Sequence, residues 1–223
     1  LGRYQPASDA TSCIACSAGR PRPAQISAAN DEANACPLCA AGQYQEFTGQ
    51  AACKTCPAGK KAAAAAAHSS EELACATCPA GEYQEQGGQT ECKLCIPGKY
   101  RDNAFRANTT AACQVCADGR YQPQSGSLSC VACSAGKFRD MSNAASSPET
   151  SACTTCASNT FQDDSGQTEC KKCPAGRHRN TQSANSDMQT ACSHCTPGKY
   201  SLAPGSVECN GCAAGQYSDN ATT

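Results

Sequence analysis

The sequence predicts a fold of small disulfide-rich repeats, an elongated array of short β-hairpin modules with much coil and little helix. Cysteine makes up 22 of the 223 residues, a level typical of disulfide scaffolds. Large apolar side chains are scarce, since the chain has no Trp and only 5% aromatic residues. Covalent bridges must therefore replace an ordinary core. A cysteine-containing frame also recurs along the chain, which indicates an internal repeat.

All cysteines fall in eleven C-x-x-C pairs, whose starts lie alternately 17 residues and 21–23 residues apart. A short module of constant length therefore alternates with a long module of variable length. The two together form a double module of about 39 residues. We expect residues 1–223 to form one continuous tandem array without an internal domain boundary.

Glycine stands three residues after the second Cys of every pair but one, where Asn159 takes its place. Asn is the non-glycine residue that best tolerates a left-handed backbone, so these positions predict turns with positive φ. Each short module has a second Gly seven residues later, which predicts a hairpin with two turns. The expected turn residues are Gly19, Gly42, Gly59, Gly81, Gly98, Gly119, Gly136, Asn159, Gly176, Gly198 and Gly215, with Gly49, Gly88, Gly126, Gly166 and Gly205 as the second set.

An aromatic residue lies two positions after the first turn glycine in the six short modules and in three long ones. We expect each ring to cover its own module's disulfide and to pack on the neighbouring module; a ligand-binding ladder of rings is the alternative. The rings are Tyr4, Tyr44, Tyr83, Tyr121, Phe161 and Tyr200 in short modules, and Tyr100, Phe138 and Tyr217 in long ones.

The long loops consist mainly of small and polar residues. The alanine run at 62–67 has the composition for one or two helical turns.

Three kinds of chemistry compete for the cysteines. Paired C-x-x-C motifs have the spacing of a zinc site with four thiolates, but eleven pairs do not divide into such sites without a remainder. The basic and apolar residues usual around intracellular zinc modules are also missing. A redox motif needs one reactive pair rather than eleven equivalent ones. Structural disulfides are therefore predicted, in an oxidising extracellular compartment, with no metal site and no cofactor.

Two pairings of the cysteines fit the spacing. The crossed pairing joins neighbouring pairs first to first and second to second, for instance Cys75 to Cys92 and Cys78 to Cys95. The sequential pairing, which we favour, closes each hairpin as its own loop. It predicts the bridges Cys16–Cys36, Cys39–Cys53, Cys56–Cys75, Cys78–Cys92, Cys95–Cys113, Cys116–Cys130, Cys133–Cys153, Cys156–Cys170, Cys173–Cys192 and Cys195–Cys209.

The sequential pairing leaves Cys13 and Cys212 over. The first residues have the pattern of a short module without its first Cys, and the last residues begin a long module that lacks its closing Cys. We therefore expect a fragment of a longer array, truncated at both ends, in which Cys13 and Cys212 have disulfide partners outside the fragment.

The frame C-x-x-C-P-A-G-x-Y-x-x-x-x-G-x-x-x-C-x-x-C resembles the ephrin-receptor-like cysteine-rich repeat, a relative in style of EGF-like and TNF-receptor-like modules. "CPAGEYQEQGGQTECKLC", residues 78–95, matches it best, and the resemblance covers essentially the whole chain. It implies a place in receptor ectodomains, adhesion proteins, protist surface antigens or flagellar hairs, the mastigonemes. The polyalanine and Ser/Thr-rich long loops differ from those of animal receptors, which favours an algal or protist surface polymer.

Other motifs are few. Asn108 and Asn220 begin N-x-[ST] sequons in long loops, so we expect glycosylation at both. A net charge of -1 without a basic stripe predicts no binding to nucleic acid. No apolar run approaches the roughly 18 residues of a membrane helix, so no membrane contact is expected within this segment. The histidines and adjacent carboxylates offer no catalytic set, and we expect no enzyme: His68, His178, His194, Glu71, Glu72, Asp163 and Asp164.

The function that these observations predict is structural. We expect an extracellular or cell-surface protein that self-associates as the building block of a filament or surface fibre, such as a mastigoneme. The alternative is the stalk of a receptor or adhesin ectodomain. A metal-binding cysteine-rich surface antigen is a third possibility.

Overall fold

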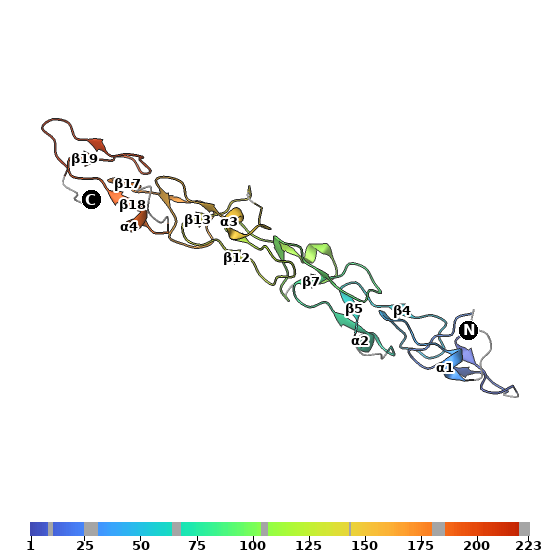
Figure 1. Ribbon diagram of the computed structural model, residues 1–223. Helices are drawn as coiled ribbons and strands as arrows, with labels where there is room; N and C mark the ends of the chain where they lie inside the picture. The colour runs from blue at the N-terminus through green and yellow to red at the C-terminus, as the bar shows by residue number, and fades with distance from the viewer. Residues whose placement is uncertain are drawn as a thin grey trace. The chain divides into compact units, whose positions relative to one another are not determined.

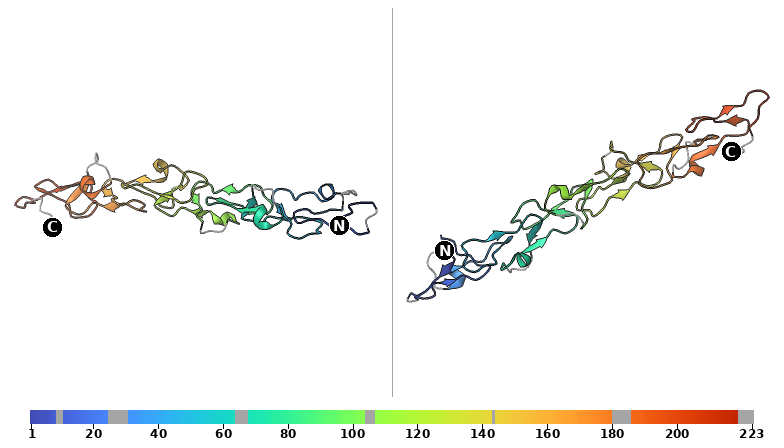
Figure 2. Two further views of the ribbon diagram at one scale, coloured as in Figure 1. Left: turned by 90° about the horizontal axis from the view of Figure 1, so that it is seen from below. Right: turned by 180° about the vertical axis from the view of Figure 1, so that it is seen from behind.

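The computed structural model describes residues 1–8, 11–24, 31–63, 68–103, 107–142, 144–179 and 186–218. The chain forms two compact units, one of Leu1–Cys95 with Arg101–Gln114 and the other of Ile96–Tyr100 with Val115–Thr223. Within each unit the modules follow one another in chain order, as the colours of Figures 1 and 2 show.

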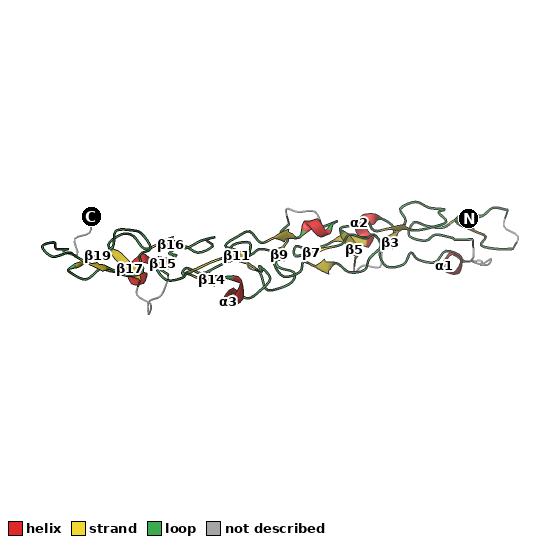
Figure 3. Cartoon of the chain, turned by 90° about the horizontal axis from the view of Figure 1, so that it is seen from above, coloured by secondary structure: helices red, strands yellow, loops and turns green. Residues whose placement is uncertain are grey.

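The strands are only two or three residues long, and they pair into two-stranded sheets (Figure 3). Each sheet joins the segment after a turn residue to the C-x-x-C pair that ends the module, as in the antiparallel pairing of Tyr44 with Lys54. The pairs are β1 (Arg3–Tyr4) with β2 (Ile14–Ala15), β3 (Gln43–Tyr44) with β4 (Lys54–Thr55), β5 (Lys60–Ala62) with β6 (Cys75–Thr77), β7 (Glu82–Tyr83) with β8 (Lys93–Leu94), β9 (Lys99–Tyr100) with β10 (Gln114–Val115), β11 (Arg120–Tyr121) with β12 (Val131–Ala132), β13 (Lys137–Phe138) with β14 (Thr154–Thr155), β15 (Thr160–Phe161) with β16 (Lys171–Lys172), β17 (Arg177–Arg179) with β18 (Cys192–His194), and β19 (Lys199–Tyr200) with β20 (Asn210–Gly211).

The predicted turns are confirmed. All the expected glycines have a positive φ, and Asn159, with a φ of 64°, is the one non-glycine residue in that region among the described residues. A two-residue strand cannot hold a hairpin together on its own. The turns and the bridges therefore carry most of the local order.

The described residues contain ten disulfides, which join the cysteines in the sequential pairing. The bridges of the short modules join residues 14 apart, and those of the long modules join residues 18 to 20 apart. Their Cα atoms lie 5.6–5.9 Å apart, the usual range for a disulfide. Cys13 and Cys212 have free thiols, of which the first is exposed.

One helical turn precedes the closing Cys of each long module. Each turn ends on a buried alanine beside that Cys, and three of them begin at an Asp or Ser whose side chain accepts a hydrogen bond from the helix N-terminus. The turns are α1 (Glu32–Ala35), α2 (Glu71–Ala74), the 3₁₀ turn η1 (Thr110–Ala112), α3 (Glu149–Ala152) and α4 (Met188–Ala191).

The helical turn of the second long module does not fall on the alanine run. Ala62 lies in β5, residues 64–67 are outside the described residues, and α2 begins after Ser70. A single turn is stable only where a cap and tertiary packing hold it. Ser70 supplies the cap, and the buried Ala74 beside Cys75 supplies the packing.

The core consists of small separate clusters rather than one interior. In four of the clusters, a short-module ring packs on the bridge and the buried alanine of the next long module. For these four rings the expectation that each covers its own bridge is corrected, while the packing on the neighbouring module is confirmed. The four rings are Tyr4 on Cys16–Cys36, Tyr44 on Cys56–Cys75, Tyr121 on Cys133–Cys153 and Phe161 on Cys173–Cys192.

Candidate functional site

The most regular feature of the structure is the set of contacts repeated where a short module meets the long modules beside it. We call this set the joint. It consists of the short-module ring, the residue after the ring, the next bridge, and an Arg of the long module. Residues from two or three modules meet there, so the joint determines how one module is held by the next.

The residue after the ring is a buried glutamine in four short modules. Its side-chain amide donates to a backbone carbonyl seven residues later and accepts from the backbone N–H two residues later, so it spans its own hairpin. The donor distances are 2.8–2.9 Å for Gln45 to Ala52, Gln84 to Glu91, Gln122 to Ser129 and Gln162 to Glu169. The acceptor distances are 3.0–3.2 Å, from Phe47, Gln86, Gln124 and Asp164.

The backbone of the same glutamine connects its hairpin to the two adjacent long modules. For Gln84, the carbonyl accepts from the N–H of Gly59 at 2.6 Å, and the N–H donates to the carbonyl of Ala107 at 2.7 Å. Gln45 and Gln122 make the same two bonds with their neighbours. One residue type thus fixes the register of three consecutive modules.

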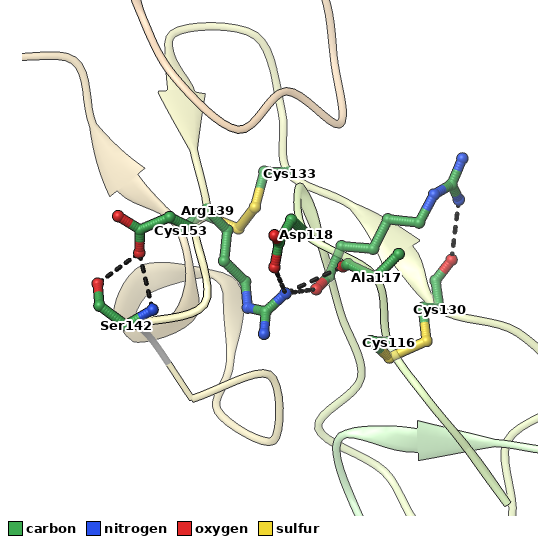
Figure 4. A network of polar contacts seen from close by, with 10 residues as sticks. Cys116, Ala117, Asp118, Cys130, Cys133, Arg139, Ser142 and Cys153 are labelled. Atoms are coloured by element: carbon green, nitrogen blue, oxygen red, sulfur yellow. Dashed lines mark hydrogen bonds and ion pairs between the residues drawn. A yellow bond between two sulfur atoms is a disulfide. The ribbon is translucent and has the colours of Figure 1, made fainter.

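In two of the long modules, a buried arginine also connects neighbouring modules through hydrogen bonds (Figure 4). Arg139 donates to the carbonyls of Ala117 and Arg120 in the preceding short module, at 3.0 and 2.8 Å, and lies 3.8 Å from Asp118. The equivalent Arg101 donates to the carbonyls of Pro79 and Glu82. Because charged donors make strong hydrogen bonds, each Arg is an effective clamp on its neighbour's backbone.

Turn glycines allow consecutive short modules to approach closely. A Cβ added to Gly119 would lie 1.9 Å from the carbonyl oxygen of Gly166, and one added to Gly42 would lie 2.6 Å from that of Gly88. No side chain fits such a gap. These glycines are therefore needed for packing as well as for their positive φ.

Three glutamates at the start of the helical turns form further contacts. Hydrogen bonds from the side chain and the backbone N–H of Ser134, the latter at 2.9 Å, hold the pKa of Glu149 below its usual value of 4.5. Glu32 accepts in the same way from Ser17, which lowers its pKa. Lys60 hydrogen-bonds to Glu71 at 2.8 Å and lowers the pKa of that carboxyl.

The remaining sequence candidates are dispersed. Asn108 is exposed, and Asn220 lies outside the described residues. Asp163 and Asp164 both form ion pairs with Lys171. His194 is exposed in β18. These side chains do not form a common site.

His178 is the exception among the histidines. Its Nδ1 lies 3.2 Å from Sγ of Cys209, and together with Cys195 it forms a group whose ligand atoms lie within 4.8 Å of one another. The two sulfurs are bonded to each other, however, so the group presents one disulfide and one imidazole.

Sequence reasoning missed the buried Gln and Arg of the joint. The signal was present, since Gln follows the ring in five of the six short modules, as Gln5, Gln45, Gln84, Gln122 and Gln162. Polar residues in a loop-rich chain are normally assigned to the surface. Here they are buried because the module has no apolar residues to fill the hairpin.

The chain was compared with known proteins. The family model described as "Tyrosine-protein kinase ephrin type A/B receptor-like" matches residues 27–72, 66–104, 103–149 and 144–189, well over half of the chain. The chain belongs to this ephrin-receptor-like family. The comparison with curated proteins found no match.

The ephrin-receptor-like repeats and the ten disulfides indicate an ectodomain-type module array at an extracellular or surface location. Among the described residues, no helix has the length and apolar character needed to cross a membrane.

Proposed function

We propose that this protein is an extracellular structural array and the building block of a filament or surface fibre. The observation that supports this most strongly is the repetition of one joint in one register. The carbonyls of Gln45, Gln84, Gln122 and Gln162 all accept from the turn glycine of the preceding long module at 2.6–2.7 Å. A repeat that meets only its neighbours, always in the same way, is the architecture of extended protein arrays.

The joints also oppose stretching. Each bridge confines a loop of 14 to 20 residues, so a module cannot extend beyond its closed loop while the bridge is intact. In four short modules the ring packs on the bridge of the next long module, and the backbone N–H groups of Gln45, Gln84 and Gln122 donate to the next long module. Tension therefore acts on covalent bonds and on buried hydrogen bonds in parallel, as a fibre requires.

Exposed apolar side chains in the C-x-x-C pairs support self-association. Large apolar residues between the cysteines of a C-x-x-C pair are about half exposed in five modules. These are Ile14, Leu38, Leu94, Val115 and Val131, with 46, 53, 52, 65 and 49% of their surface accessible. Isolated exposed residues are normal, but one that recurs with the module offers a repeating contact to a second copy.

The test is the assembly state of the chain. Sedimentation velocity should show concentration-dependent association, and L38S/L94S/V131S should abolish it with all ten bridges intact. M141S and L202S, which change exposed apolar residues outside the C-x-x-C pairs, serve as the control. Imaging of native material should show packed copies that a reducing agent disperses. A chain that remains monomeric at high concentration would contradict the proposal.

A stalk of a receptor or adhesin ectodomain is the second candidate, and the family description favours it. The two functions differ in assembly. A stalk predicts single copies attached to a membrane by a part of the protein outside this sequence, with no ordered contacts between copies.

Glycosylation at Asn108 and Asn220 belongs to the same proposal. Asn108 is exposed and lies just before Thr109, the N-cap residue of η1. We expect peptide N-glycosidase to convert both Asn residues of the native protein to Asp, as read by mass spectrometry. N108Q should reduce the mass by one glycan. Unmodified Asn at both sites would reject this part of the proposal.

A further inference from the structure

One disulfide of the array has an imidazole in place of an apolar cover. The position two residues after a long-module turn glycine holds Tyr100 in one module, and that ring packs on the next short-module bridge, Cys116–Cys130. The equivalent positions before the other short-module bridges hold Pro21, Lys61, Phe138 and His178. His178 is thus the residue that the repeat places next to the Cys195–Cys209 bridge.

The local structure explains the contact. β17 pairs with β18 so that His178 lies opposite Ser193, two residues before Cys195. The ring is partly buried, and its Nδ1 lies 3.2 Å from Sγ of Cys209. Cys195 is buried, whereas Cys209 is partly exposed.

A cavity of about 250 Å³ opens at this bridge. Its lining includes His178 and Cys209, together with Thr196, Lys199 and Glu208, so the charged groups that face it are one cation and one carboxylate. A small thiol can therefore reach the more exposed sulfur beside the imidazole.

We propose that Cys195–Cys209 is a thiol-exchange site, a disulfide that small-molecule thiols cleave in preference to the other bridges of the array. The thiolate attacks Sγ of Cys209 and the S–S bond breaks. Cys195, whose sulfur lies within 4.8 Å of the His178 imidazole, leaves with the bonding electron pair and takes up a proton from water. The products are a mixed disulfide on Cys209 and a thiol at Cys195. A second thiolate then releases Cys209 and forms the oxidised small-molecule disulfide.

The physical basis is stabilisation of the departing sulfur. A cationic imidazole beside a cysteine favours the thiolate, and a thiolate of lower pKa leaves faster. Stabilisation of the departing sulfur in this way should accelerate exchange roughly tenfold. The comparison bridge is Cys156–Cys170, which has the same separation of 14 and a second Cys that is also partly exposed, with Phe138 at the equivalent position.

The experiment is time-resolved reduction of the full chain by limiting dithiothreitol, followed by iodoacetamide and peptide mapping of each Cys. All variants carry C13S and C212S, so that the added reagent supplies the only thiol. We expect Cys195 and Cys209 to be alkylated about tenfold faster than Cys156 and Cys170. H178F should remove the difference, and F138H should accelerate cleavage of Cys156–Cys170.

Local fraying near the end of the chain would give another pattern, since Cys173–Cys192 would then also be reduced faster and H178F would not slow the reaction. H178Q repeats the test with a polar, non-basic side chain if the Phe variant does not form its bridges. Equal rates at the two bridges, or rates that do not change in H178F and H178Q, would overturn the proposal.

Discussion

Buried amides fill the short hairpins of this protein in place of apolar side chains. Gln162, 2% exposed, is the largest of the fully buried side chains in the described residues. A buried polar group is tolerated when its hydrogen bonds are made, and each glutamine of the joint uses both its donor and its acceptor. The amide thereby holds the hairpin shut without needing a core.

Removing one of these amides tests that role. In Q84A the carbonyl of Glu91 and the N–H of Gln86 lose a buried partner, at a cost of about 1–3 kcal/mol. We expect faster hydrogen exchange in the β7–β8 hairpin. Q86A, which alters an exposed side chain of the same hairpin, should leave exchange near the wild-type rate. Equal exchange in the two variants would show that the buried amide is not needed.

Acid stability depends on the glutamates at the helical turns. Because the pKa of Glu149 is lowered in the folded protein, its contribution to stability is present above its usual value of 4.5. That contribution disappears as the pH falls through the lowered pKa. We expect the amide of Ser134 to exchange faster at pH 3 than at pH 7, relative to its intrinsic rate. In E149Q the Ser134 amide should already exchange faster than in the wild type at pH 7. E72Q, which changes an exposed side chain, should leave the exchange of that amide unchanged.

At the scale of secondary structure, the elements are too short to be stable alone. The helices are single turns, and the strands are two or three residues long and lie between a turn residue and a disulfide. Each element is therefore ordered by its ends, through caps, bridges and glycines, rather than by its own propensity.

Two glycine substitutions separate backbone strain from packing. Gly119 and Gly176 have φ values of 76° and 78°, so G119A and G176A pay a similar cost for a left-handed alanine, about 1–2 kcal/mol. The new Cβ of G176A meets nothing within 4 Å, whereas that of G119A collides with the carbonyl of Gly166. We expect the melting temperature to fall further in G119A, with faster exchange at Gly166. Equal losses would mean that the close approach is not important.

At the scale of the molecule, stability is local because the core is divided into small clusters. The Cys133–Cys153 bridge contacts Tyr121 of the preceding short module, and the carbonyl of Cys133 accepts from Gly166 of the next. Contacts of this kind couple nearest neighbours, so stability is close to a sum of module and joint contributions.

Deleting one bridge should therefore loosen a limited region. In C133A/C153A we expect a loss of about 3 kcal/mol for a loop of this length. Exchange should accelerate in β11–β12 and at Gly166, and remain unchanged in β19–β20 of the same unit. Unfolding of the whole unit in a single step would contradict this view, and hydrogen exchange with mass spectrometry distinguishes the two results.

The sequence by itself determined the module order, the family and the positive-φ turns from Gly19 to Gly215, including the one at Asn159, because these depend on spacing and on backbone sterics within a few residues. It favoured the sequential pairing, and the structure has that pairing because 14 residues with two turns bring the two Cα atoms within disulfide range. Only the tertiary structure decided that five of the rings cover the next bridge, that glutamines fill the hairpins and that His178 touches Cys209. These contacts depend on the stacking of one module on another, which no residue spacing within a module specifies.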